Sequence, residues 1–199
     1  MSDTLHISEK AKEPASIAVP IDNMALYGDL YIPVGANGLV VFAHGSGSSR
    51  LSVRNRYVAG VLNEHQAGTL LIDLLTQEEE EIDRLTSHLR FDILMLADRL
   101  SSISKWIQVQ PLLNNLKIGY FGASTGGAAA LIAAAKRPDK IAAVVSRGGR
   151  PDLAMNFLPQ VKAPTLLIVG ECDPQVLRVN KQALEKLNDK SKLDIIPRA

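Results

Sequence analysis

The stretch GYFGASTGGAAAL, residues 119–131, joins an apolar run to an alanine-rich one through a single turn. The run that leads into it, residues 116–122, is apolar almost throughout, as in a strand buried on both faces of a sheet. Residues 124–137 are rich in alanine and end in two basic residues before a proline, which is typical of a helix C-terminus. Ser124 therefore stands where a buried strand passes into a helix.

Ser124 allows two interpretations at this position. In the pattern G-x-S-x-G, a serine at a strand-to-helix turn is a catalytic nucleophile, and the turn needs small neighbours because strand and helix approach closely. Gly122, Gly126 and Gly127 supply that room. A serine at the same position can instead serve only as a helix cap that accepts a backbone N–H. The other motifs of the chain favour the nucleophile.

Apolar runs recur along the chain, and their alternation with helical segments indicates the fold class. Two short runs, 16–20 and 24–33, flank the turn-forming IDN and predict a hairpin. Buried strands are predicted at residues 39–44, 69–75, 116–122, 141–146, 163–170 and 192–197. Helices are predicted at residues 51–65, 87–107 (with Ser87 as its cap), 124–137 and 175–188. This order predicts an α/β fold with a doubly wound, mostly parallel sheet.

The length of 199 residues allows one sizeable core, so a single domain is expected at residues 15–199 behind a flexible N-terminal tail, residues 1–14. The acidic run EEEEID, residues 78–83, is expected to be a solvated loop or the start of a helix. Only 16 residues, 147–162, separate two predicted strands, which leaves no room for a helical lid there. Any site at this edge of the sheet is therefore expected to be open and lidless.

Composition excludes several classes of protein. The 22 basic and 21 acidic side chains give a net charge of +1, which argues against a nucleic-acid binder. The single cysteine, Cys172, excludes an internal disulfide and multi-cysteine metal motifs. No metal and no cofactor are expected. The polar N-terminus lacks a secretion signal, and no apolar run approaches the roughly 18 residues needed to span a bilayer. We therefore expect a soluble, cytoplasmic protein without a membrane partner.

The turn HGSGSS, residues 44–49, follows the predicted strand 39–44. A glycine-rich turn after such a strand can present backbone N–H groups to an oxyanion. We predict that the amides of Ser46 and Thr125 form the oxyanion hole, and that His44 orients the turn by hydrogen bonding rather than acting as a base.

The turn GECDP, residues 170–174, ends another predicted strand and places an acid after the nucleophile in chain order. Asp173 is the predicted catalytic acid, in preference to Glu171, because it lies further into the turn. The alternative is that Asp173 only caps the helix that follows.

Arginines follow two of the predicted strands at the sheet edge where α/β proteins bind ligands. They are Arg50, Arg54, Arg56, Arg147 and Arg150. Guanidinium groups bind carboxylates through paired hydrogen bonds, so an anionic substrate would suit these five arginines, which we call the arginine rim. Candidate substrate-binding residues are His44, Gly45, Arg50, Arg54 and Arg147. Internal pairing with Asp152 or Asp73 would explain the same arginines equally well.

The combination of VVFAHGSGSS, DLLT, GYFGASTGGAAAL, SRGGRPDLA and LLIVGECDP resembles an α/β-hydrolase, and more narrowly the dienelactone hydrolase-like branch. The resemblance implies hydrolysis of a small ester or lactone through an acyl-enzyme, with Ser124 as nucleophile and Asp173 paired with a histidine. Dienelactone hydrolases proper carry cysteine where this chain has Ser124, which leaves the cognate lactone open.

The position of the histidine departs from the family pattern. In the family it lies after the last strand and before a closing helix, whereas here only Arg198 and Ala199 follow KLDIIP. The histidines of the chain are His6, His44, His65 and His88, and we expect none of them to be the base. The expectation is a serine hydrolase whose domain is C-terminally incomplete and lacks the closing helix. A non-catalytic hydrolase-like binding domain and an acyltransferase remain as alternatives, and the oligomeric state stays open.

Overall fold

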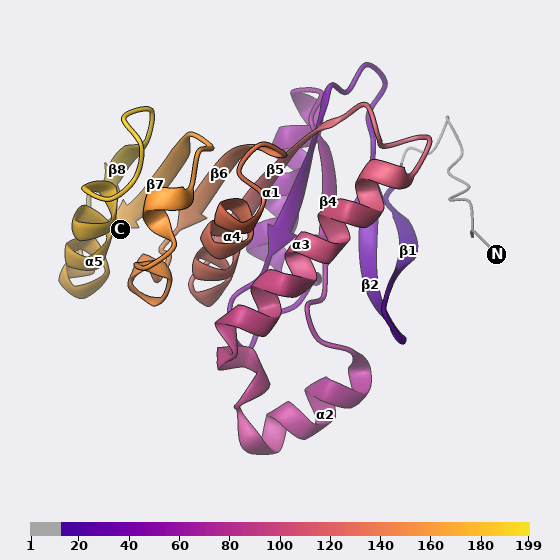
Figure 1. The fold of residues 1–199 in the computed structure, drawn as a ribbon, viewed down its shortest axis with the longest axis horizontal. Helices are drawn as coiled ribbons and strands as arrows, with labels where there is room; N and C mark the ends of the chain where they lie inside the picture. Colours follow the sequence, from indigo (N-terminus) through magenta and orange to yellow (C-terminus); the bar gives the residue numbers. More distant parts are fainter. Residues whose placement is uncertain (1–12) are drawn as a thin grey trace.

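An eight-stranded sheet forms the middle layer of the protein in the computed structural model, which describes residues 13–199 (Figure 1). The predicted tail, residues 1–14, thus lies almost wholly outside the described residues. The strands are β1 (Ala15–Ile21), β2 (Met24–Tyr31), β3 (Gly38–Ala43), β4 (Gly68–Ile72), β5 (Lys117–Ala123), β6 (Ile141–Arg147), β7 (Thr165–Gly170) and β8 (Lys192–Ile196).

The strand order is β1-β2-β4-β3-β5-β6-β7-β8. The pairs β1–β2 and β2–β4 are antiparallel, and all the others are parallel. This arrangement confirms the predicted doubly wound, mostly parallel sheet that begins with an antiparallel hairpin. The carboxyl ends of β3, β5, β6 and β7 therefore meet at one edge, where the motifs of the sequence converge.

Helices cover both faces of the sheet. They are α1 (Val53–Glu64), α2 (Gln77–Thr86), α3 (Ile93–Val109), α4 (Thr125–Lys136) and α5 (Pro174–Leu184), with short 3-10 turns η1 (Leu89–Phe91), η2 (Pro151–Ala154) and η3 (Leu158–Gln160). In Figure 1 α3 and α4 lie in front of the sheet and α1 lies behind it. None of the helices within residues 13–199 is long and apolar enough to cross a membrane.

Successive residues of β5 show how the sheet is buried on both sides. Tyr120 packs into the large core beneath α3 and α4, and its hydroxyl lies 2.5 Å from the Ser104 hydroxyl. Phe121 points to the opposite face, where its ring centroid lies 4.9 Å from that of Phe42. Side chains alternate between the two faces of a strand. Because both faces of β5 are buried, its sequence is an almost uninterrupted run of apolar residues.

The predicted helix 87–107 starts later than expected. The structure has α3 begin at Ile93, with Asp92 as its N-cap accepting the amide of Met95 at 3.0 Å. Ser87 is instead the C-cap of α2, in the left-handed conformation at φ 57°. The prediction was wrong because Leu89, which lies in η1, keeps helical spacing to Ile93, so periodicity alone could not reveal the break.

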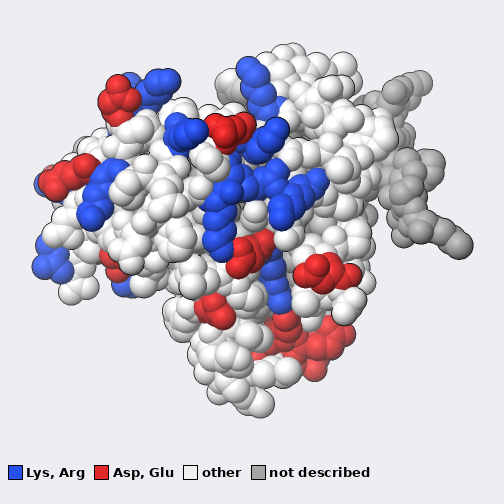
Figure 2. All heavy atoms as spheres, viewed as in Figure 1, with Lys and Arg blue, Asp and Glu red and all other residues white. Residues whose placement is uncertain are grey.

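The acidic run 78–83 lies within α2, a helix that extends below the sheet in Figure 1. Acidic side chains gather at this lower end of the molecule in Figure 2. Thr76 and Glu79 form a reciprocal capping box at its start. Two ion pairs anchor the helix: Arg99 binds Glu79 at 2.5 Å, and Arg90 binds Asp83 at 2.5 Å. The run is therefore an ordered helix held against the body of the protein.

Candidate active site

Ser124 occupies a strained turn between β5 and α4. Its φ of 51° and ψ of −122° lie outside the regions that non-glycine residues ordinarily adopt. The residue is exposed, and its side chain makes no capping hydrogen bond. The interpretation of Ser124 as a helix cap is therefore wrong, and its hydroxyl projects from the turn toward solvent.

Glycines next to Ser124 are required by close packing of the backbone. A Cβ on Gly126 would lie 2.2 Å from the carbonyl oxygen of Ala43, and one on Gly122 would lie 2.4 Å from the carbonyl oxygen of Gly126. A side chain at Gly126 would push the turn away from β3, and one at Gly122 would push β5 away from the start of α4. The G-x-S-x-G pattern thus has the physical cause that the sequence suggested.

The segment 147–150 brackets Ser124 from the neighbouring strand. The Ser124 amide donates to the carbonyl of Arg147 at 3.3 Å, and the amide of Arg150 donates to the carbonyl of Ser124 at 3.1 Å. The side chain of Asn180, which is fully buried, donates to the carbonyl of Gly149 at 3.1 Å. Sequence reasoning missed this support, because nothing local to Asn180 indicates that α5 reaches the turn after β6.

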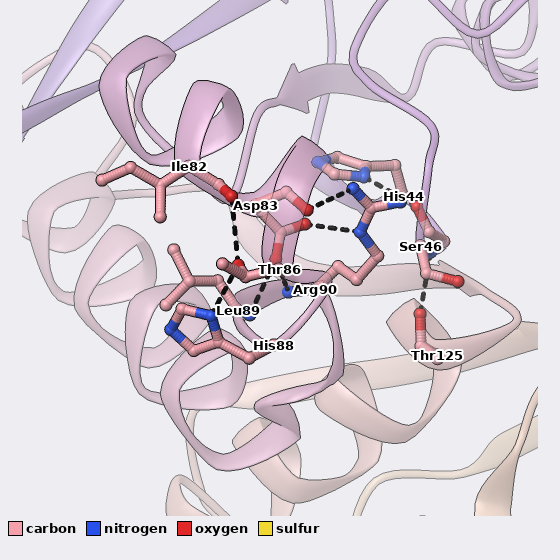
Figure 3. A network of polar contacts seen from close by, with 10 residues as sticks. His44, Ser46, Ile82, Asp83, Thr86, His88, Leu89, Arg90 and Thr125 are labelled. Atoms are coloured by element: carbon pink, nitrogen blue, oxygen red, sulfur yellow. Dashed lines mark hydrogen bonds and ion pairs between the residues drawn. The ribbon is translucent and has the colours of Figure 1, made fainter.

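The turn after β3 lies beside Ser124. A Cβ placed on Gly45 would lie 3.1 Å from the Cβ of Ser124. The amide of Ser46 donates to the hydroxyl of Thr125 at 2.9 Å, as Figure 3 shows. The two predicted oxyanion residues are thus brought together, but the Ser46 amide is engaged by a side chain.

His44 uses both ring nitrogens to hold this turn. Nδ1 lies 3.0 Å from the carbonyl oxygen of Gly45, and Nε2 accepts the amide of Leu74 at 3.1 Å. Because Nε2 accepts a hydrogen bond, the ring proton resides on Nδ1 and donates to Gly45. The ring therefore orients the turn in the way the sequence predicts.

The other described histidines are engaged locally. His65 Nδ1 lies 2.9 Å from the carbonyl oxygen of Val61, and His88 Nδ1 lies 2.8 Å from the hydroxyl of Thr86. Both residues are exposed, and His6 lies outside the described residues. Within residues 13–199, the structure shows no hydrogen bond from a histidine to the hydroxyl of Ser124.

Asp173 is exposed at the end of β7, two strands from Ser124 in the sheet. Its Oδ1 accepts the amide of Val176 at 3.0 Å, so it caps α5. The preceding amide, of Cys172, donates to the carbonyl of Ala199 at 2.8 Å. Residues 197–199 consequently lie against the turn that carries the predicted catalytic acid, while Oδ2 of that acid makes no hydrogen bond within residues 13–199.

A cleft of about 610 Å³ opens between the turn after β3 and the α2–η1 segment. Its walls include His44, Ser46 and Arg90, and its floor includes the apolar Leu75 and Leu96. Figure 3 shows the Asp83–Arg90 pair on the α2 side of this region. The sequence did not reveal this side of the cleft, because the acidic run 78–83 was expected to be only a solvated loop or the start of a helix.

The arginines of the rim fall into two groups. Arg50 binds the carboxylate of Asp73 through its backbone and its side chain, and it also lies 3.6 Å from Asp29. Internal pairing is thus the correct interpretation for Arg50, which the structure removes from the candidate substrate-binding residues. Arg150 likewise pairs with Asp152 at 2.7 Å.

Arg147 and Arg54 form the second group. Arg147 is half-buried, its guanidinium lies 5.7 Å from the ring centroid of Phe121, and it donates to Asn55 at 3.2 Å. Burial, together with the charge of Arg54, lowers the pKa of Arg147 below its ordinary value. In the described part of the chain, neither arginine forms an ion pair with a carboxylate.

Residues 54–196 match the model of the dienelactone hydrolase family. The chain belongs to the dienelactone hydrolase family. The solved dienelactone hydrolase from Anabaena variabilis ATCC 29413 is 60% identical and superposes with a TM-score of 0.92, over 94% of this chain and 88% of that one. Est1E from Butyrivibrio proteoclasticus is 16% identical with a TM-score of 0.76, over 92% of this chain and 88% of that one, and shows the shared fold alone.

Two curated relatives of this dienelactone hydrolase family member come from Mycobacterium tuberculosis strains CDC 1551 and H37Rv. Each is 53% identical over 172 residues and is provisionally named a phosphoribosyl transferase. The match covers 86% of this chain and 38% of each relative. The chain thus spans well under half the length of these relatives, and their name describes much longer proteins.

Proposed function

We propose that this chain is the core of a serine hydrolase that cleaves a small ester or lactone, with Ser124 as the nucleophile on a nucleophile elbow. The observation that carries the proposal is the exposed hydroxyl of Ser124 on a strained backbone that three main-chain hydrogen bonds hold in place. Strain of this kind persists only where the surroundings impose it, and it is concentrated at functional sites.

In the proposed reaction, the oxygen of Ser124 attacks the ester carbonyl carbon while a general base takes the hydroxyl proton. The carbonyl electron pair moves onto the oxygen, which becomes a tetrahedral oxyanion at the N-terminus of α4, where the helix dipole favours negative charge. Collapse of this intermediate breaks the bond to the alcohol, which receives the proton from the base. Water then repeats both steps and releases the acid.

Asp173 is proposed to orient the histidine that acts as this base. Its position at the carboxyl end of β7 supports the role, as does its Oδ2, which has no hydrogen-bond partner within residues 13–199. The histidines at 44, 65 and 88 are engaged elsewhere. The proposal therefore places the base outside residues 13–199.

The substrate is proposed to carry an anionic group near the reacting ester. Arg147 and Arg54 support this, since two neighbouring guanidinium groups that have no carboxylate partner within residues 13–199 favour a bound anion. Phosphoribosyl transfer, the activity in the provisional name of the curated relatives, is the alternative function. Because the match covers 38% of those relatives, we favour hydrolysis for the part that this chain represents.

Ester hydrolysis by the 199-residue chain with added imidazole tests the proposal. Imidazole can replace the base, so the rate for 4-nitrophenyl acetate should rise with imidazole beyond the uncatalysed background, and Ser124→Ala should abolish that rise. A fluorophosphonate should label Ser124 in the parent chain, as detected by peptide mass spectrometry. Equal imidazole-dependent rates for the parent chain and Ser124→Ala would refute the nucleophile and favour a non-catalytic binding domain. If Ser124 is labelled, competing alcohols as acceptors would separate hydrolysis from acyl transfer.

A further inference from the structure

The hydroxyl of Thr125 has no role in the predicted oxyanion hole, which consists of the backbone amides of Ser46 and Thr125. Thr125 is the first residue of α4, is 4% exposed, and accepts the amide of Ser46 at 2.9 Å across 79 positions of sequence. Within residues 13–199, its own proton has no acceptor. A threonine hydroxyl is both acceptor and donor, so this O–H remains available for one further hydrogen bond.

The same contact changes the role of Ser46. An amide N–H carries one proton, and the Ser46 amide already gives it to the hydroxyl of Thr125. Donation to a hydroxyl polarises the O–H bond and strengthens the next hydrogen bond that the hydroxyl donates. Any effect of the Ser46 amide on a bound oxyanion would therefore pass through the hydroxyl of Thr125.

Thr125 is also placed where negative charge would develop. It directly follows Ser124, and Gly45 of the opposing turn packs against the Ser124 side chain. The amide of Thr125 is at the first position of α4, where an N–H has no acceptor within the helix. One residue thus offers two donors, amide and hydroxyl, beside the nucleophile.

We propose that Thr125 supplies both of these donors to the oxyanion, and that the Ser46 amide is a positioning group that holds the hydroxyl in its donating orientation. This inference rests on the proposed function. In the step itself, the electron pair of the carbonyl bond moves onto oxygen as the bond to Ser124 forms, and the two donors of Thr125 bind that oxygen without transferring a proton.

Substitutions that separate the hydroxyl from the amide test this assignment. Thr125→Val keeps the shape and the amide but lacks the hydroxyl, and it should lower kcat by about 100-fold or more with little change in KM, as for loss of one oxyanion donor. Thr125→Ser retains the hydroxyl and should stay within about fivefold of the parent chain. Thr125→Ala provides the same test if the valine variant does not fold. Thr69→Val removes the hydroxyl of a buried threonine in β4 that donates to Asn63; it is the matched control and should leave the rate unchanged.

A thiono ester supplies a readout that a purely structural role would not change. Sulfur accepts weaker hydrogen bonds than oxygen, so the oxo-to-thiono rate ratio should fall toward one in Thr125→Val but not in Thr125→Ser. A valine variant as fast as the parent chain, or faster, would overturn the inference and assign the oxyanion to the Ser46 amide. Failure of the parent chain to react at Ser124 would instead refute the proposed function, whatever the Thr125 variants do.

Discussion

The amide of Arg150 donates a hydrogen bond of 3.1 Å to the carbonyl oxygen of Ser124. This contact joins the turn after β6 to the strained residue after β5, and with the bond from the Ser124 amide to Arg147 it holds that residue from both sides. Backbone strain of this size costs about 1–3 kcal/mol, so the surrounding hydrogen bonds must offset it. The geometry of the candidate nucleophile therefore depends on a segment that is distant in sequence.

Asn180→Ala should weaken this support. The side chain donates to the carbonyls of Gly149 and Val176, and its loss leaves both buried acceptors with fewer partners. The free energy of unfolding, measured by urea denaturation, should fall by about 1–3 kcal/mol. The rate of fluorophosphonate labelling at Ser124 should fall as well. The exposed Asn114→Ala is the control and should change neither quantity, and an unchanged labelling rate in Asn180→Ala would contradict a positioning role.

Gly126→Ala should prevent the turn from forming. The added Cβ would lie 2.2 Å from the backbone oxygen of Ala43, which cannot move without shifting β3. We expect a loss of more than about 3 kcal/mol in the free energy of unfolding, or no folded protein. Gly60→Ala is the matched control, since a Cβ there meets nothing within 4 Å in the interior of α1. It should stabilise the protein by about 0.5–1 kcal/mol.

The anchoring of α2 should be sensitive to acid. Hydrogen bonds from Arg99 lower the pKa of Glu79 below its ordinary 4.5. Burial raises the pKa of Asp83, but hydrogen bonds from Arg90 and from the backbone outweigh it, and the net pKa lies below 3.8. Above these unfolded-state pKa values, both carboxylates therefore contribute in full to the free energy of unfolding. That contribution is lost as the pH falls through their lower folded-state pKa values.

Unfolding curves measured from pH 7 to pH 3 should show this loss only below about pH 4.5, where the carboxylates begin to bind protons. Glu79→Gln should be less stable at pH 7 and less dependent on pH than the parent chain. Glu78→Gln is the matched control, because Glu78 is exposed and makes no ion pair within residues 13–199. An identical pH dependence for all three proteins would contradict the prediction.

Arg147→Gln should change substrate preference. For an ester that carries a carboxylate, we expect KM to rise about 10-fold or more, since a charge-assisted hydrogen bond contributes about 1.5–3 kcal/mol. A neutral ester of equal size should be hydrolysed as before. Arg50→Gln serves as the comparison: it should lower stability, because Asp73 loses its cation, without changing the preference. Equal effects of Arg147→Gln on both esters would rule out the anion site.

The sequence predicted the order of the strands and of helices α1, α3, α4 and α5. It misplaced the start of α3, and it left the acidic run of α2 open between a loop and the start of a helix. Continuous apolar runs identified the buried strands of the parallel sheet, because a strand covered on both faces has no polar side. The break before α3 was missed, since Leu89 and Ile93 keep the spacing of one helix across η1. The capping of α3 by Asp92 and not Ser87 depends on where the chain turns, which periodicity does not report.

The sequence by itself determined the fold class, the family and the position of Ser124 in a glycine-rich turn between strand and helix. Those features are local, since they follow from spacing and from the space that each residue type occupies. Only the tertiary structure decided that Arg50 forms an internal ion pair whereas Arg147 forms none within residues 13–199. It also decided that Asn180 supports the turn beside Ser124 and that the Ser46 amide binds Thr125. The contacts of Arg50, Asn180 and Ser46 each join segments at least 23 residues apart through hydrogen bonds or charge. Such contacts exist only once the strands have brought the loops to one edge of the sheet.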